Sequence, residues 1–199
     1  MSRIVSRPLD EVAGWLLLGT FPGTKVDDSS GGTLRFLDMP EALSTKPQPY
    51  RHDWAPGVDY ARIYTGWTYP PKDYARWGQL VYEWVRHSVE RYGMTEVESW
   101  WWEVWNEPDI GYWQGTPEEY RKLYDFAADG LKRALPTARI GGPHVTGPNG
   151  ARTQQLLRDF IEHCLHGTNY ATGKTGSPLD YVGFHERLRR LLNGALLVE

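Results

Sequence analysis

Helix-like and strand-like stretches alternate along the chain from about residue 67 onward, and this order limits the possible folds more than any other feature. Apolar residues recur at helical spacing in three stretches, at 77–92, 120–135 and 152–165. Short apolar runs with the residue types of strands lie at 99–105, 138–141 and 179–184. Strands that alternate with helices form parallel sheets with crossover helices. The sequence therefore predicts an α/β fold.

Local signals mark the ends of the predicted helices. Gly93 follows the first helix and suits the left-handed conformation that closes a helix. Thr116 and Glu119 form a capping box before the second helix, and Pro117 occupies its first position. Pro136 follows the same helix and prevents its continuation.

The segments outside this alternation have less regular patterns. Residues 34–37 predict a strand, and residues 39–43 predict a turn after it. Residues 45–66 and 167–177 lack periodicity and are predicted to be loops. The Arg- and Leu-rich stretch at 186–197 predicts a terminal helix.

Composition excludes several classes of function. The chain has 199 residues, enough for one domain with a sizeable core, and its formal net charge is -3 without a basic stripe for nucleic acid or lipid. Cys164 is the only cysteine, so no intrachain disulfide is possible, and its helical pattern predicts a buried small hydrophobe. Residues 15–18 form an apolar run that is too short to span a membrane. Because we identify no signal peptide and no metal-ligand spacing, we expect a cytoplasmic protein without membrane, nucleic-acid, metal or cofactor partners.

The aromatic run Trp100 to Trp105 ends in Asn106-Glu107-Pro108 and is the strongest candidate for a catalytic site. A carboxyl group at the end of a strand keeps its proton more readily when indole rings wall it, which suits general acid catalysis on a sugar. Asn106 can donate to and accept from a sugar hydroxyl. The ten Trp and twelve Tyr residues fit carbohydrate binding, but they equally fit a core built from large rings.

Each of these residues also has a purely structural interpretation. Glu107 could be a solvent-facing turn residue, and Asn106 could serve an Asx turn. Strict alternation would send their side chains to opposite faces, so both serve one site only if the strand ends there, as Pro108 suggests. Glu103 shares the parity of Glu107, and we favour a buried, hydrogen-bonded structural carboxylate over a second catalytic one.

Four further residues are candidates for contact with a substrate. Trp105 and Trp113 offer ring faces on which a sugar can stack. His144 and His185 each follow a predicted strand and are candidates to line the pocket, although a hydrogen-bonded structural role fits each nearly as well. Trp100 and Trp102, by contrast, are predicted to pack beneath helices.

These motifs together resemble glycoside hydrolase family 39, which contains β-xylosidases and α-L-iduronidases. The resemblance covers residues 39–185 and is carried by these segments: Met39-Pro40-Glu41-Ala42-Leu43, Tyr69-Pro70-Pro71-Lys72-Asp73-Tyr74, Glu90-Arg91-Tyr92-Gly93, Trp102 to Pro108, Tyr112-Trp113, Glu119-Tyr120, Leu123-Tyr124 and Gly141-Gly142-Pro143. It implies a (β/α)8 barrel and retaining hydrolysis of a xyloside-type carbohydrate. Glu107 would be the general acid/base, Asn106 would contact the sugar 2-hydroxyl, and His185 would lie at the carboxyl-terminal face of the barrel.

The chain departs from the family pattern at both ends. The family's nucleophilic Glu follows the seventh strand, and residues 186–199 do not resemble that region; Glu186 is a weak substitute because a Glu that opens a helix usually complements the helix dipole. We therefore predict one catalytic domain over 1–199 that forms a partial barrel, roughly strands 3 to 6, with atypical ends at 1–38 and 186–199. A truncated or frame-disrupted gene would explain such ends, and little turnover is expected from this chain alone. The alternative is a non-catalytic carbohydrate-binding or assembly fragment.

Overall fold

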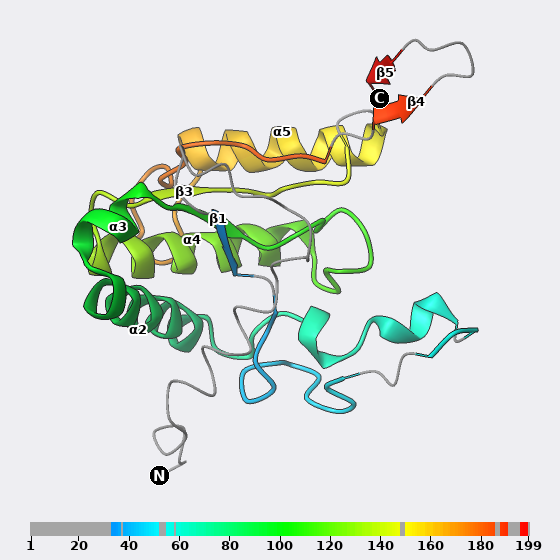
Figure 1. Cartoon of the computed structure of the whole chain (residues 1–199), viewed down its shortest axis with the longest axis horizontal. Coiled ribbons are helices and arrows are strands. Elements are labelled where there is room, and N and C mark those ends of the chain that lie inside the picture. Colours follow the sequence, from blue (N-terminus) through cyan, green and yellow to red (C-terminus); the bar gives the residue numbers. More distant parts are fainter. Residues whose placement is uncertain are drawn as a thin grey trace.

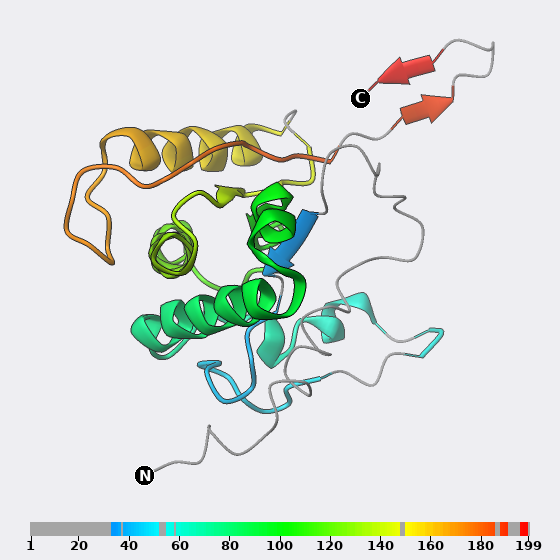
Figure 2. The same ribbon diagram turned by 60° about the vertical axis from the view of Figure 1, so that its left-hand side comes forward.

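The computed structural model describes residues 33–36, 38–51, 55–57, 59–147, 150–185, 188–190 and 196–198. The long helices lie along one side of a small parallel sheet, and a separate two-stranded ribbon lies near the C-terminus (Figures 1 and 2). The elements are β1 (Thr33–Phe36), η2 (Tyr60–Ile63), η3 (Gly66–Thr68), α2 (Tyr74–Tyr92), α3 (Met94–Ser99), β2 (Trp101–Val104), α4 (Pro117–Ala134), β3 (Arg139–Gly141), α5 (Ala151–His166), β4 (Leu188–Arg190) and β5 (Leu196–Val198). The α/β class predicted from the alternating pattern is confirmed.

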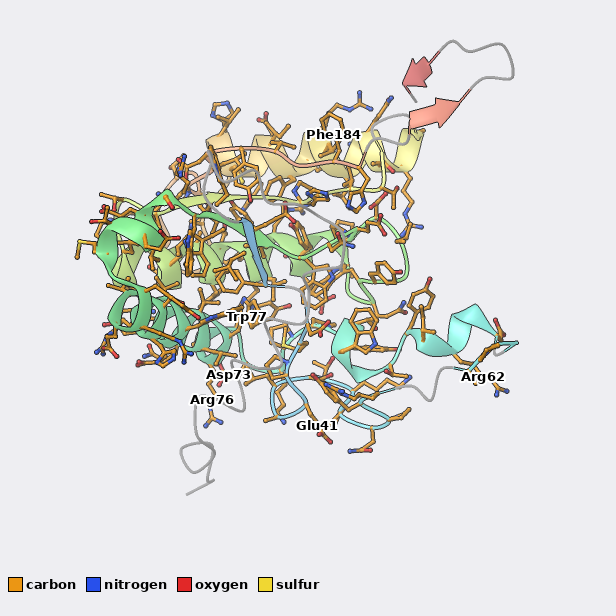
Figure 3. All side chains as sticks on the ribbon, viewed as in Figure 1. Glu41, Arg62, Asp73, Arg76, Trp77 and Phe184 are labelled. Atoms are coloured by element: carbon orange, nitrogen blue, oxygen red, sulfur yellow. The ribbon has the colours of Figure 1, made fainter. Side chains whose placement is uncertain are left out.

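The sheet has the order β1-β2-β3, and both pairs of strands are parallel. The predicted strand at 179–184 is not a regular strand. Its residues run parallel to β3 and make only isolated bridges, Gly141 with Tyr181 and Val145 with Phe184. Just before the first bridge, the Asp180 side chain accepts the Ile140 N–H at 2.8 Å. The same segment passes along α5, where Figure 3 labels Phe184.

Helices α2 and α4 lie side by side against the sheet (Figures 1 and 2). The core between α2 and the sheet is aromatic: the Phe36 ring stacks on Trp102 at 5.5 Å and meets Trp84 edge-on at 4.9 Å. Trp77, labelled in Figure 3, is buried, and its indole N–H donates to the Leu123 carbonyl of α4 at 3.1 Å. These contacts confirm that Trp102 packs beneath a helix.

The ends of the helices follow the capping signals in the sequence. The Asp73 side chain accepts the Arg76 N–H at 3.0 Å and begins α2 (both labelled in Figure 3). Gly93 ends this helix with a φ of 88°, which confirms its predicted role. The capping box between Thr116 and Glu119 is also confirmed, because each side chain accepts the backbone N–H of the other residue.

We expect Thr116→Ala to lower the free energy of unfolding by about 1 kcal/mol, because it removes the acceptor of the Glu119 N–H. Urea denaturation followed by circular dichroism measures this loss. Thr116→Ser keeps the hydroxyl and should stay close to the wild type. An equal loss in both variants would show that the methyl group, rather than the cap, stabilises the helix.

The C-terminal prediction is wrong for the described residues. Instead of a helix within 186–197, strands β4 and β5 pair antiparallel, with Arg189 opposite Leu197. The sequence does contain a signal typical of hairpins, since Asn193-Gly194 separates two short apolar runs. Smaller differences also occur: the short helix α3 was not predicted, and the predicted loop at 45–66 contains η2. The region at 167–177 is a loop, as predicted.

Candidate active site

The end of β2 turns the chain so that Asn106 and Glu107 no longer follow strand alternation. The strand stops at Val104, and both Trp105 (φ 71°) and Glu107 (φ 48°) adopt left-handed backbone conformations. Such conformations are uncommon for residues other than glycine and cost on the order of 1–3 kcal/mol each, and they cluster at functional sites. Asn106 and Glu107 were expected to serve one site only if the strand ends before them, and the strand does end there.

Glu107 is held from two directions. Its backbone N–H donates to the carbonyl of His144 at 2.9 Å, which ties the end of β2 to the segment after β3. Its carboxylate oxygen Oε1 lies 2.5 Å from Nδ1 of His185, and the Glu107 side chain is 16% exposed. These contacts thus orient the carboxyl group, and the Glu107 side chain is largely shielded from water but not completely buried.

A second carboxylate–histidine pair lies beside the first. Glu103 is 1% exposed, and its Oε2 atom lies 2.7 Å from Nδ1 of His144. The rings of His144 and His185 meet at 4.2 Å with an interplanar angle of 70°. Glu103, His144, His185 and Glu107 therefore form a continuous chain of contacts, which we call the Glu–His chain. The buried, hydrogen-bonded state predicted for Glu103 is confirmed.

The other residues predicted to contact a sugar are more buried than such contact requires. Asn106 is buried next to Glu107, at 5% exposure. Trp105 and Trp113 are also buried, and their indole N–H groups donate to the carbonyls of Tyr112 and Thr116. The two rings meet edge-on at 5.1 Å. Stacking on a sugar stays a prediction for both, and their burial favours a packing role.

Sequence reasoning missed Asp38, which follows β1 at the same edge of the sheet as Glu107 follows β2. Burial raises the pKa of the Asp38 carboxyl to about 6, and the Arg51 charge opposes this rise. The available signal was its position just after a strand, the same signal that made Glu107 a candidate.

Sequence reasoning also missed Asp109. Its carboxylate accepts from the Thr146 and Thr153 hydroxyls and so joins the site to α5.

The raised pKa of Asp38 predicts a pH dependence of stability. Because the folded state binds this proton more tightly than the unfolded state, Asp38 stabilises the fold below about pH 4, and this contribution is lost as the pH rises through about 6. We expect that loss to be absent in Asp38→Asn. Urea midpoints measured from pH 4 to 7 test this. Asp159→Asn, at an exposed position on α5, is the control, and its midpoint should change with pH as that of the wild type does.

Several other expectations concern partners and location. No group of three or more potential metal ligands occurs within the described part of the chain. Among the described residues, no helix combines the length and apolarity needed to cross a membrane. Burial raises the pKa of the Cys164 thiol to about 12, in line with its predicted role as a small hydrophobe. Glu186 lies outside the described residues, and the cytoplasmic location stays a prediction.

Comparison with known proteins establishes the family. The family described as "Glycosyl hydrolases family 39" matches residues 45–195. The family resemblance predicted from the motifs covered residues 39–185, so the match begins six residues later and ends ten residues later. The chain belongs to glycosyl hydrolase family 39. The resemblance inferred from the motifs is therefore confirmed.

Family 39 relatives are much longer than this chain. A β-xylosidase from Caldicellulosiruptor saccharolyticus is 35% identical over 150 residues, which cover 74% of this chain and 26% of the relative. Human α-L-iduronidase is 37% identical over 117 residues, covering 56% and 17%. The chain thus spans about a quarter or less of these curated relatives.

Solved structures agree with the sequence matches. A monomeric β-xylosidase from Caulobacter crescentus has a TM-score of 0.55 at 28% identity and covers 83% of this chain and 29% of its own. A bacterial orthologue of human α-L-iduronidase has a TM-score of 0.52 at 32% identity, covering 57% and 18%. The α/β fold and its parallel sheet are accordingly similar to part of these two solved structures.

Proposed function

We propose that this chain supplies the acid/base part of a retaining glycosidase that hydrolyses O-glycosidic bonds, with a β-xyloside as the substrate. The position of Glu107 supports this proposal most directly. Its carboxyl group stands at the carboxyl end of a parallel strand, partly shielded from water and bonded to His185. The matches to β-xylosidases extend over 150 and 154 residues and that to human α-L-iduronidase over 117, which favours a xyloside over an iduronide.

In the proposed mechanism, Glu107 first protonates the glycosidic oxygen while a second carboxylate attacks the anomeric carbon. The leaving alcohol departs, and a glycosyl-enzyme forms. Glu107 then removes a proton from water, which hydrolyses that intermediate. The Nδ1 atom of His185 can accept from protonated Glu107 or donate to its carboxylate, so it can hold the side chain in place in both steps. Asn106 would hydrogen-bond a sugar hydroxyl.

Retention requires the two carboxyl groups to be roughly 5 Å apart. Glu103 is the other carboxylate on β2, and its bond to His144 disfavours it as the nucleophile. We therefore propose that the nucleophile comes from sequence outside the described residues. In this arrangement β1, β2 and β3 would be the third, fourth and fifth strands of a partial (β/α)8 barrel, and residues 179–185 would lie in place of the sixth.

The direct experiment measures binding and hydrolysis with the same purified chain. Calorimetric titration with xylotriose reports binding, and release of 4-methylumbelliferone from its β-xyloside and α-L-iduronide reports turnover. Xyloside hydrolysis that Glu107→Gln removes would establish the glycosidase and place every required group within these 199 residues. We expect binding with little turnover. A chain that neither binds nor hydrolyses either sugar would contradict the proposal.

A non-catalytic carbohydrate-binding or assembly role is the second candidate. The hydrogen bond between Glu103 and His144 favours this second role. It engages Glu103, so β2 offers one carboxylate for catalysis, Glu107, rather than two. Binding of xylotriose that survives Glu107→Gln, without hydrolysis under any condition, would support this role over catalysis.

A further inference from the structure

We propose that Glu103 and His144 are positioning residues that hold the pair formed by Glu107 and His185, so that the Glu–His chain acts as one unit. Nothing in the proposed reaction requires Glu103 or His144 to touch the sugar. Their contacts nevertheless converge on the proposed acid/base by two independent routes, one through the backbone and one through the imidazole rings.

The backbone route starts at the left-handed conformation of His144. His144 has a φ of 45°, and its carbonyl accepts the Glu107 N–H at 2.9 Å. A residue other than glycine keeps this conformation only where surrounding contacts hold it. The bond from the His144 ring to the buried Glu103 carboxylate is such a contact, so it indirectly fixes the backbone of Glu107.

The ring route runs through His185. Because Oε2 of Glu103 binds Nδ1 of His144 at 2.7 Å, rotation of the His144 ring is restricted. That ring packs edge-on against His185 at 4.2 Å, and Nδ1 of His185 contacts Glu107. The orientation of His144 therefore limits the orientations open to His185 and to the carboxyl group beyond it.

Gly183 keeps space for this arrangement. A Cβ atom at this position would lie 2.5 Å from Nδ1 of His144 and 3.2 Å from Oε2 of Glu103. Gly183 stands two residues before His185 on the same segment, and its carbonyl accepts the Val145 N–H at 3.3 Å. The segment that delivers His185 to Glu107 is thus shaped around the neighbouring pair.

Burial supports a positioning role over simple packing. A carboxylate at 1% exposure carries a desolvation cost that an apolar residue of similar size would avoid. A buried polar pair is better explained by the geometry that it imposes, since hydrogen bonds restrict direction and apolar contacts do not. The geometry imposed here is that of the proposed acid/base.

The test follows the imidazole nitrogens of His144 and His185 by long-range 1H–15N NMR, which reports which ring nitrogen carries the proton. Glu103→Gln keeps both histidines in the chain, so the nitrogens of both can still be followed. We expect it to change the nitrogen signals of both histidines and the amide signal of Glu107, while the surface control Glu162→Gln changes none of them. A change confined to His144, with His185 and Glu107 unaffected, would overturn the proposal.

Two further variants keep the test decisive. Glu103→Asp retains a carboxylate and should partly restore the wild-type signals. If Glu103→Gln fails to fold, the double variant E103Q/H144F removes both polar partners and keeps an aromatic ring beside His185; unchanged His185 signals in that variant would also overturn the proposal. Any effect on turnover rests on the proposed function, whereas the NMR result does not, so failure of one is distinguishable from failure of the other.

Discussion

Replacement of Glu107 by glutamine is expected to slow cleavage of phenyl β-xyloside by about 10²–10⁴-fold, the usual contribution of a positioned general acid. The amide of glutamine has nearly the shape of the carboxyl group but cannot deliver a proton to the leaving oxygen. Phenol is a basic leaving group and depends strongly on that proton. The loss should be much smaller for 4-nitrophenyl β-xyloside, whose leaving group departs readily as an anion.

The assay should include azide as an external nucleophile, so that it does not depend on the position of the second carboxylate. Azide attacks the anomeric carbon, the glycosidic bond breaks, and the phenol leaves with the proton of Glu107; the products are xylosyl azide and phenol. Glu162→Gln on the exposed surface of α5 is the matched control. A Glu107→Gln rate that falls equally for both leaving groups would argue against a role as general acid.

Truncation of Trp102 to alanine is expected to remove about 3–5 kcal/mol from the free energy of unfolding. This indole is completely buried at the centre of the aromatic core, stacked on Phe36 and edge-on to Trp84 at 6.2 Å. Its loss leaves a cavity between β2 and α2 that neighbouring rings cannot fill. Because domains are typically stable by about 5–15 kcal/mol, the variant should be close to unfolding.

Trp102→Phe is the matched control for this truncation. The Trp102 Nε1 atom has no hydrogen-bond partner within the described part of the chain, so phenylalanine loses ring volume but no polar contact. We expect a smaller loss than for alanine. Urea denaturation followed by circular dichroism measures both variants, and equal losses would show that the indole nitrogen, rather than ring volume, matters at this position.

The helices and their ends could be predicted from sequence because their signals are local. The apolar spacing of α2, the capping box of Thr116 and the glycine at 93 each act within a few residues. The aromatic strand with its Asn-Glu-Pro end likewise made Glu107 the candidate acid/base, and together with the other family-like segments it pointed to the family.

Tertiary structure alone decided how the carboxylates are used. Glu103 meets His144 across 41 residues, and Glu107 meets His185 across 78, so no local pattern specifies either pairing. The burial that raises the pKa of Asp38 also depends on distant segments. Sequence by itself thus determined the main helices, the family and the choice of Glu107 as the candidate acid/base. The partner, orientation and burial of each carboxyl group depend on residues that are distant in the chain. Only the tertiary structure, which brings the carboxyl ends of the parallel strands together, decides them.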